Sequence, residues 1–303
     1  MAETVKTVSF AEKTLAEALI QQAYCVHEHL DWSDSHNLFN PDNICFALNN
    51  DENNYEGLLV LSQKTPGIFW VQFFYSIHST NDQRLDDWRQ LFSAAIETLQ
   101  LKKALVAAIP TSNVFQALLI NSQFRRFEEI IFLEANYTDF SPAVLTPPEA
   151  VTIHSLQPDD LPQIATLCEK AFPPLWRLSP ENIRIATRQS DYTLVLKTDG
   201  EIIAYLLASQ NQGAAHLARI AVTPALQLHG LGSFLLSSMF EYYIQLGITR
   251  FTVNTQSSNT SAITLYQKNG FYRTFDTYPV YSYGSQPYGL KKRQQPNNQR
   301  RNK

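Results

Sequence analysis

The chain has 303 residues, 44% hydrophobic and 12% aromatic, which is enough to bury a substantial core and fits two domains better than one. Its formal net charge of −4 hides a basic end: residues 291–303 carry six Lys or Arg and no acid, so removing those six charges leaves −10 on residues 1–290. The basic end has no aromatic residue to stack on a base, and no apolar run approaches the roughly 18 residues of a membrane span. We therefore expect neither a nucleic-acid nor a membrane partner.

The start of the chain and the cysteines indicate the compartment. The first residues, MAETVKTVSFAEKTLAEAL, lack the basic start and apolar core of a secretory signal. Cys25, Cys45 and Cys168 form no CxxC pair and the seven histidines are dispersed, so no metal site is expected. We expect free, mostly buried thiols in a cytoplasmic protein, with residues 285–303 as a basic disordered tail.

The first half of the chain, residues 1–145, ends in an apolar strand pattern, IIFLEANY (130–137). It is followed by SPAVLTPPEA (141–150), whose three prolines make it the best linker candidate between two domains.

After this linker, strand and helix patterns alternate over residues 150–284. A strand (151–156) and a helix (158–172) lead into the loop AFPPLWRL (171–178). A short helix (179–190) follows, with Ser179 as N-cap and Pro180 at its first position. The remaining expected elements are a hairpin turning at Asp199-Gly200 (191–210), a strand (214–222), a helix (230–247), a strand (248–256), a helix (259–270) and a strand or hairpin (271–284). This order predicts a mixed α/β domain.

The two halves share a pattern at one offset. A shift of 147 residues places Phe124 on Phe271, ALLINSQF on TLYQKNGF, and residues 73–75 on 220–222. Identities are sparse, but strands and helices stay in phase without a gap, which predicts a duplicated fold.

The stretch QLHGLG (227–232) stands between a strand pattern and a helix pattern. Glycines there can form an ordinary tight turn, or expose backbone N–H groups at a helix N-terminus, where an anion is favoured. Two glycines alone do not distinguish these readings, and a dinucleotide-binding loop would need a third.

The surrounding residues resemble the GNAT superfamily of acetyl-CoA-dependent N-acetyltransferases. The similarity covers roughly residues 151–283 and rests on two separated motifs. The first runs from Ile220-Ala221-Val222 through Gln227-Leu228-His229-Gly230-Leu231-Gly232, and the second comprises Asn259, Ala262, Leu265, Tyr266, Gly270 and Phe271. The resemblance implies two GNAT-like domains, each a mixed, mostly antiparallel twisted sheet flanked by helices.

The resemblance also implies roles for these residues. The backbone of Ile220, Ala221 and Val222 would pair with the pantetheine arm of acetyl-CoA, and the N–H groups from Leu228 to Ser233 would hold its pyrophosphate. Asn259 would bind the cofactor or simply cap its helix, and Tyr266 would protonate the departing thiolate or simply pack in the core. His229 is expected to offer its backbone N–H rather than its side chain.

The base is where this sequence departs from the family. Members that acetylate protein N-termini carry a Glu at the position of Asn254, which cannot take a proton, and histone-acetylating members carry one at the position of His216. Strand alternation would place His216, Ala218, Ile220 and Val222 on one face. His216 is therefore either the base or a histidine bonded to solvent or backbone.

The first half lacks these features. The 147 shift places Thr80–Leu85, without a glycine, under QLHGLG, and Leu119 under Tyr266. We expect this half to bind no acetyl-CoA, and we expect the glycines, if dispensable to the fold, to serve the ligand in the second half. The acceptor is a small-molecule or peptide amine, and the protein a monomer or homodimer. Four residues have two possible roles: they line the acceptor pocket, or they simply pack in an exposed loop and in the sheet core. They are Trp176, Arg177, Tyr281 and Tyr283.

Two other readings stay open at this point. One is a catalytically idle acyl-CoA-binding or regulatory module, and the other is a tandem acetyltransferase that resembles mycothiol synthase in layout. No residue points to the thiol-sugar amine of the latter.

Overall fold

The computed structural model describes residues 4–9, 12–29, 43–49, 54–101, 104–137 and 150–284. The predicted linker, apart from its last residue, and the predicted tail at 285–303 lie outside the described residues. Cys25, Cys45 and Cys168 are free and buried, as predicted. No helix in the described part of the chain is both long and apolar enough to cross a membrane.

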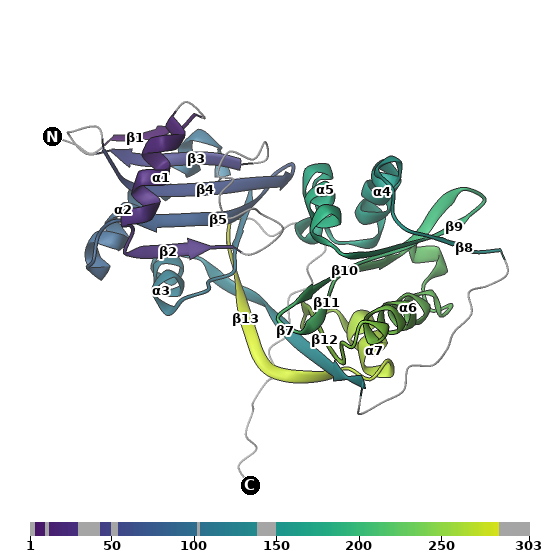
Figure 1. The fold of residues 1–303 in the computed structure, drawn as a ribbon. Coiled ribbons are helices and arrows are strands. Elements are labelled where there is room, and N and C mark those ends of the chain that lie inside the picture. Colours follow the sequence, from purple (N-terminus) through teal and green to yellow (C-terminus); the bar gives the residue numbers. More distant parts are fainter. Residues whose placement is uncertain are drawn as a thin grey trace, which may run out of the picture.

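The two halves share one order of helices and strands, except that the first half has strand β2 where the second has helix α5 (Figure 1). The first half comprises β1 (Thr4–Thr7), α1 (Lys13–Gln22), β2 (Cys25–Glu28), β3 (Asn43–Asn49), β4 (Tyr55–Thr65), β5 (Ile68–Ser76), α2 (Asn81–Thr98), β6 (Leu105–Ala108), α3 (Asn113–Asn121) and β7 (Arg125–Asn136). The second comprises β8 (Thr152–His154), η4 (Pro158–Asp160), α4 (Leu161–Ala171), η5 (Pro174–Trp176), α5 (Pro180–Gln189), β9 (Tyr192–Thr198), β10 (Glu201–Asn211), β11 (Ala214–Val222), η6 (Pro224–Leu226), α6 (Leu231–Gln245), β12 (Arg250–Gln256), α7 (Thr260–Lys268) and β13 (Tyr272–Gly284).

The offset of 147 residues is kept by several elements. It carries both ends of α3 onto the ends of α7, and the last residue of α2 onto the last residue of α6. The predicted fold class, two related mixed α/β halves with mostly antiparallel strands, is confirmed. The exact domain limits at 145 and 150 stay a prediction.

Local sequence signals set the ends of these elements. Ser179 accepts a hydrogen bond from the Asn182 N–H at 3.1 Å and so caps α5, as its position before Pro180 predicts. Asp199 and Gly200 both have positive φ angles, 51° and 81°, which is the conformation that a tight turn between β9 and β10 requires.

The halves exchange their last strands within one continuous sheet. Its order is β1-β3-β4-β5-β6-β13-β7-β12-β11-β10-β9-β8, with β2 added beside β5. β7 of the first half pairs with β12 of the second, and β13 of the second pairs with β6 of the first. Figure 1 shows β13 (yellow) running from the second half into the first. The segment expected as a strand or hairpin at 271–284 is therefore one long strand.

This exchange decides the place of two predicted acceptor residues. Tyr281 is buried in the core of the first half, and the Tyr283 ring lies 5.0 Å from Phe92 and 5.5 Å from Phe124. Both tyrosines are therefore sheet core, which is the second of the two alternatives left open by the sequence.

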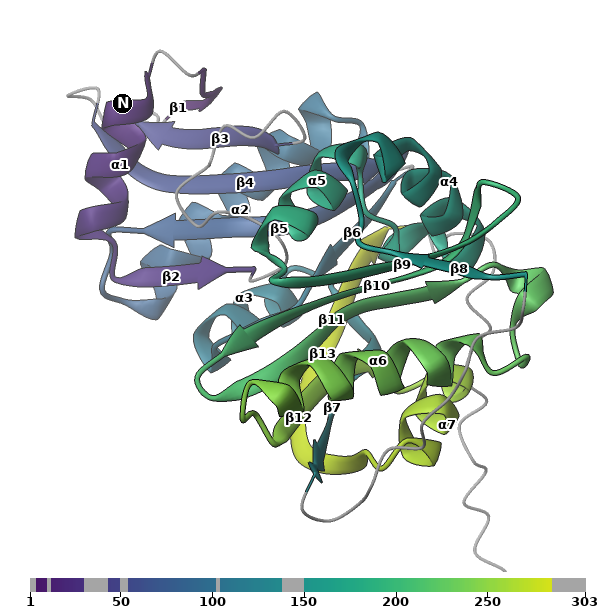
Figure 2. The same cartoon turned by 45° about the vertical axis from the view of Figure 1, so that its right-hand side comes forward.

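Helices cover both faces of the second half's sheet (Figure 2), and each face has its own core. On one face, α6 and α7 pack through fully buried side chains such as Phe240 and Met239. On the other face, α4 and α5 pack over Tyr205 and Ala221. Each fully buried Phe or Met contributes roughly 1.5–3 kcal/mol to folding. The candidate site lies where β11 connects these two layers.

Candidate functional site

The strands β11 and β12 lie together at one end and part at the other. They pair in parallel only from Ala214 to Leu217, although β11 continues to Val222 and β12 to Gln256. Residues 219–222 therefore pair with β10 on one side and have no strand on the other, as far as the chain is described. This open strand edge includes Ile220, Ala221 and Val222, and it leaves backbone groups free to pair with an extended ligand.

A β-bulge lies at the start of the open edge. Leu207 pairs with Arg219 while Ala208 pairs with Leu217, so Ala218 is an extra residue. The bulge reverses the alternation of side chains beyond it. Leu217, Ile220 and Val222 consequently pack toward α6, whereas His216 points to the opposite face. The expectation that His216 shares a face with Ile220 and Val222 is wrong for this reason.

The loop Gln227–Gly230 leads from the open edge into α6. The Gln227 amide donates to the Val222 carbonyl at 3.2 Å, and the first hydrogen bond of the helix runs from the Phe234 N–H to the Gly230 carbonyl at 2.9 Å. No side chain caps α6, and its first turn carries no acid. The N–H groups of Leu231, Gly232 and Ser233 thus lie at the positive end of the helix dipole without helical partners. We call the backbone of Leu228–Ser233 the α6 cradle.

Each glycine of the α6 cradle has its own physical reason. Gly230 has a φ of +85°, which strongly favours glycine, and a Cβ there would meet no atom within 4 Å. A Cβ on Gly232 would lie 3.0 Å from Leu265 Cδ2, so this glycine lets α7 pack against α6. The expectation that the glycines serve only a ligand is therefore incomplete, because Gly232 also has a packing role.

His229 directs its side chain into its own loop. Its Nδ1 lies 2.8 Å from the Gln227 carbonyl, and the residue is exposed. This geometry accords with the expectation that His229 contributes its backbone N–H.

The first half is different at both of these features. Thr80 caps α2 by accepting from the Gln83 N–H at 3.4 Å, and Asp82 lies in the first turn. The edge of β5 beyond its short pairing with β6 is covered by β2, from Cys25 opposite Ser76 to Glu28 opposite Phe73. In the first half, the Thr80 side chain thus caps the helix start and β2 covers the strand edge, whereas the second half leaves both the start of α6 and the edge of β11 open.

The bulges of the two halves also correct the sequence alignment. In β5 the extra residue is Gln72, which corresponds to Ala218 in β11. Residues 73–75 therefore correspond to 219–221, one position away from the 220–222 expected from the constant offset.

Tyr266 and Asn259 both lie on the α7 side. Tyr266 is buried with its ring 5.8 Å from Phe271, and burial raises the pKa of its hydroxyl while the charge of Arg219 opposes this rise. Its hydroxyl is therefore protonated at neutral pH. Asn259 caps α7 by accepting from the Ala262 N–H at 3.3 Å, and its amide donates to Thr255 Oγ1 at 3.1 Å. The capping role is confirmed, and contact with a cofactor stays a prediction.

His216 is half-buried on the face toward α4 and α5. Its Nδ1 lies 2.9 Å from Thr252 Oγ1 on the neighbouring strand. Burial lowers the pKa of His216, and a hydrogen bond with the Asn254 side chain opposes this effect. A lowered pKa leaves the imidazole neutral at pH 7, which is the state that a base requires.

One charged residue of this face, Arg219, was not predicted from the sequence as a site residue. Arg219 precedes Ile220 directly, and its Nη2 donates to the Trp176 carbonyl at 2.7 Å, while its Nε donates to the Tyr205 hydroxyl at 3.3 Å. Its guanidinium also stacks 3.8 Å above the Phe172 ring. A cation inside the apolar run LARIAV was the signal that could have identified it.

The loop with these contacts is held by the first half. Trp70 Nε1 donates to the Leu175 carbonyl at 3.2 Å, Thr65 Oγ1 donates to the Pro174 carbonyl at 3.2 Å, and the Trp70 and Trp176 rings lie 5.4 Å apart. Arg177 turns back, with its Nε donating to the Phe172 carbonyl at 3.1 Å. Trp176 is thus positioned between the two halves, beside Arg219.

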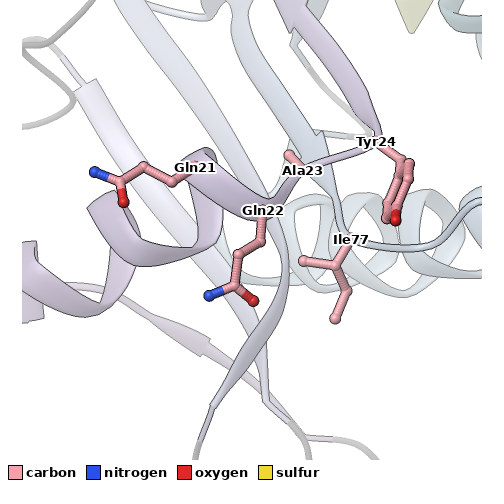
Figure 3. Close-up of a pocket in the computed structure, with 5 residues that line it drawn as sticks. All are labelled: Gln21, Gln22, Ala23, Tyr24 and Ile77. Atoms are coloured by element: carbon pink, nitrogen blue, oxygen red, sulfur yellow. The ribbon is translucent and has the colours of Figure 1, made fainter.

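A surface depression lies elsewhere, at the end of α1. Figure 3 shows its lining residues, Gln21, Gln22, Ala23, Tyr24 and Ile77. It offers two amides and one phenol and no carboxylate, histidine or amine. We therefore place the candidate site at the open edge of β11, where ionisable groups and a helix N-terminus converge.

Known proteins match both the sequence and the fold. Residues 161–271 match the model of the acetyltransferase (GNAT) family. The chain is 30% identical over 122 residues to [ribosomal protein bS18]-alanine N-acetyltransferase of Escherichia coli strain K12, covering 40% of this chain and 80% of that protein.

Two solved structures share the fold over 93% of this chain. A tandem GNAT protein from the clavulanic acid biosynthesis pathway has a TM-score of 0.59 at 12% identity, with 98% of that chain covered. A probable N-acyltransferase from Enterococcus faecalis V583 has a TM-score of 0.67 at 10% identity, with 72% of that chain covered. At these identities the likeness concerns the fold alone.

Proposed function

The chain belongs to the GNAT family of acetyltransferases, and from this premise we propose that its second half transfers the acetyl group of acetyl-CoA to a primary amine by direct attack in a ternary complex. The observation that carries the proposal is the open edge of β11 leading into the uncapped start of α6.

These two features fit the parts of acetyl-CoA in order. The open strand edge at Ile220–Val222, where the Val222 carbonyl accepts, among the described residues, only from the Gln227 side chain, suits the amide groups of pantetheine, which pair as an added strand would. The α6 cradle suits the pyrophosphate, because it combines unpaired N–H groups, a positive helix end and no nearby carboxylate in the first turn. Gln227 and His229 frame the loop through contacts with its own backbone.

Two side chains suit the proton transfers. When bound, acetyl-CoA supplies a thioester whose C–S bond breaks as the amine nitrogen forms an amide, so the nitrogen loses one proton and the sulfur gains one. Tyr266 holds a proton at its hydroxyl because burial raises its pKa, which is the state a general acid needs. His216 is neutral at pH 7 because burial lowers its pKa, and a neutral imidazole can accept the amine proton directly or through water.

The first half has a different task in this proposal. Thr80 and Asp82 occupy the start of α2, and β2 covers the edge of β5, so we infer that this half binds no acetyl-CoA. Through Thr65 and Trp70 it holds the loop that bears Trp176 over the acceptor side. The acceptor is an amine of a small molecule or a peptide, the latter being the class acted on by the Escherichia coli relative, whose name specifies a protein alanine.

Calorimetry and a thiol-release assay on the full chain test this proposal. We expect one acetyl-CoA to bind per chain, and free thiol to appear with at least one member of an amine panel of amino acids, polyamines, aminosugars and short peptides. Binding without thiol release for any amine would favour the idle acyl-CoA-binding module. No binding at all would refute both functions, and two sites per chain would refute the inference about the first half.

A further inference from the structure

Arg219 is a half-buried cation whose hydrogen-bond partners among the described residues are all neutral. Besides the Trp176 carbonyl and the Tyr205 hydroxyl, its guanidinium donates to Cys168 Sγ at 3.4 Å. No carboxylate pairs with it among the described residues, and no hydrogen bond there uses its Nη1. A charge that is partly withdrawn from water without an opposite charge beside it keeps part of its desolvation cost uncompensated.

The fold itself does not require a cation at this position. The equivalent residue of the first half is Phe73, which is fully buried. An apolar side chain therefore suits this place in the strand, and the arginine in the second half calls for another explanation.

The guanidinium is also held in place. Three hydrogen bonds and the Phe172 ring, 3.8 Å from its central carbon, fix the plane of the fork. Burial alone would lower the pKa of Arg219, but Tyr205 and Cys168 outweigh it, so the pKa lies above its usual value and the charge persists. Among the described residues no hydrogen bond uses Nη1, so its two N–H groups can donate to a carboxylate oxygen in a charge-assisted hydrogen bond.

This fork faces the acceptor side rather than the phosphates. Arg219 shares its face with Ala221 and the α4–α5 layer, while Ile220 and Val222 face α6. The charge of Arg219 also opposes the rise in the pKa of the Tyr266 hydroxyl, the proposed general acid. In the proposed complex the pantetheine and acetyl groups carry no charge, and an anion beside Arg219 must come with the acceptor.

We infer that Arg219 binds a carboxylate of the acceptor, so that the substrate is a small amine that also carries a carboxylate, such as a free amino acid. This inference rests on the proposed acetyltransferase function and names its substrate class.

Matched acceptor pairs test it on the full chain. The pairs are glycine and glycinamide, β-alanine and β-alaninamide, and γ-aminobutyrate and its amide, each assayed by thiol release from acetyl-CoA. A carboxylate raises the pKa of its neighbouring amine and so lowers the neutral fraction, which favours the amide on chemical grounds. We expect the acid of a reacting pair to have a kcat/KM at least tenfold higher all the same, with the separation between amine and carboxylate showing which chain length fits.

The variant Arg219→Gln should remove this preference and Arg219→Lys should retain part of it, while Arg188→Gln, which removes an exposed charge from the end of α5, should leave it unchanged. Equal rates for acid and amide in the parent would overturn the inference. So would an Arg219→Gln variant that slows both members equally, because that result indicates a role in packing or in the reaction itself.

A binding measurement separates this inference from the proposed function. In the presence of CoA, N-acetylglycine should bind at least tenfold more tightly than N-acetylglycinamide, and Arg219→Gln should abolish the difference. If no amine releases thiol, the proposed function is refuted. The comparison of N-acetylglycine with N-acetylglycinamide still tests whether Arg219 binds a carboxylate. Equal binding of acid and amide refutes that site regardless of turnover.

Discussion

Replacing Gly230 by aspartate places a negative charge in the α6 cradle, where the pyrophosphate of acetyl-CoA is proposed to bind. The variant should still fold, because a Cβ at this position meets no atom within 4 Å. The φ of +85° costs an ordinary L-residue ~1–2 kcal/mol, and aspartate and asparagine tolerate that region better than most.

The expected loss of affinity follows from the charge. One added charge about 5 Å from a phosphate costs ~1–3 kcal/mol for effective dielectric constants between about 80 and 20. A mid-range value of ~2 kcal/mol corresponds to roughly 30-fold weaker binding of acetyl-CoA. Gly230→Asn carries no charge, but its side chain can cap the helix as Thr80 caps α2, so we expect a smaller loss, about 1 kcal/mol.

The first half supplies a matched control. Gln83 lies 147 residues before Gly230, in the first turn of α2, and Gln83→Asp adds the same charge to the related helix. Calorimetry with acetyl-CoA should show parental affinity for Gln83→Asp, and urea unfolding should show that all three variants fold. Gly230→Asp protein that binds acetyl-CoA within twofold of the parent would refute the reasoning about the α6 cradle.

Three further predictions concern titrating groups. Tyr266→Phe should lower kcat by about 10²–10⁴ with little change in the acetyl-CoA dissociation constant, and an unchanged kcat would remove Tyr266 as the general acid. In the parent, the rate should fall at acidic pH as His216 becomes protonated, at a pH below the ordinary histidine pKa because burial lowers the pKa of His216. His216→Ala should abolish this acidic limb of the pH–rate profile. A variant that retains the limb would exclude His216 as the base. Burial lowers the pKa of His27 to about 3 in the folded state. Between pH ~6.5 and ~3, His27 is therefore protonated in the unfolded state but not in the folded state. The free energy of unfolding should therefore fall by ~1.4 kcal/mol per pH unit as the pH drops from ~6.5 toward ~3. Urea titrations at pH 6.5 and 5 should show a drop of ~2 kcal/mol that His27→Phe reduces, and an equal drop in both proteins would contradict this account.

Elements with local signals were predictable from the sequence. Ser179 before Pro180, the Asp199-Gly200 turn, and Asn259 at the start of α7 each act on backbone groups within a few residues, so their effects are legible in a short stretch. The two motifs around Gly230 and Tyr266 likewise located the candidate site before its geometry was known.

Features that depend on distant pairing were not predictable in this way. β7 pairs with β12 across more than a hundred residues, and neither strand carries a mark that distinguishes this partner from its own half. Ala218 gives no sign of a bulge, yet the bulge decides that His216 and Ile220 face opposite sides. Arg219 was overlooked because its meaning lies in its neutral partners, which come from α4, η5 and β10.

The strand exchange changes how the two halves should be understood. The first half has a capped α2 and a covered β5 edge, so its retention in the chain needs a reason other than a second cofactor site. Its β7 lies between β12 and β13, and its Trp70 holds the Leu175 carbonyl beside the residue that orients Arg219. Residues 150–284 alone would lack β7, which pairs with the edge of β12 and contributes Ile131, Leu133 and Ala135 to the core beneath α6. A loss of activity in that fragment would thus report on a broken sheet. Trp70→Phe in the full chain instead keeps the sheet, removes the hydrogen bond to the Leu175 carbonyl and reduces the ring contact with Trp176, so it tests whether the first half positions the acceptor loop.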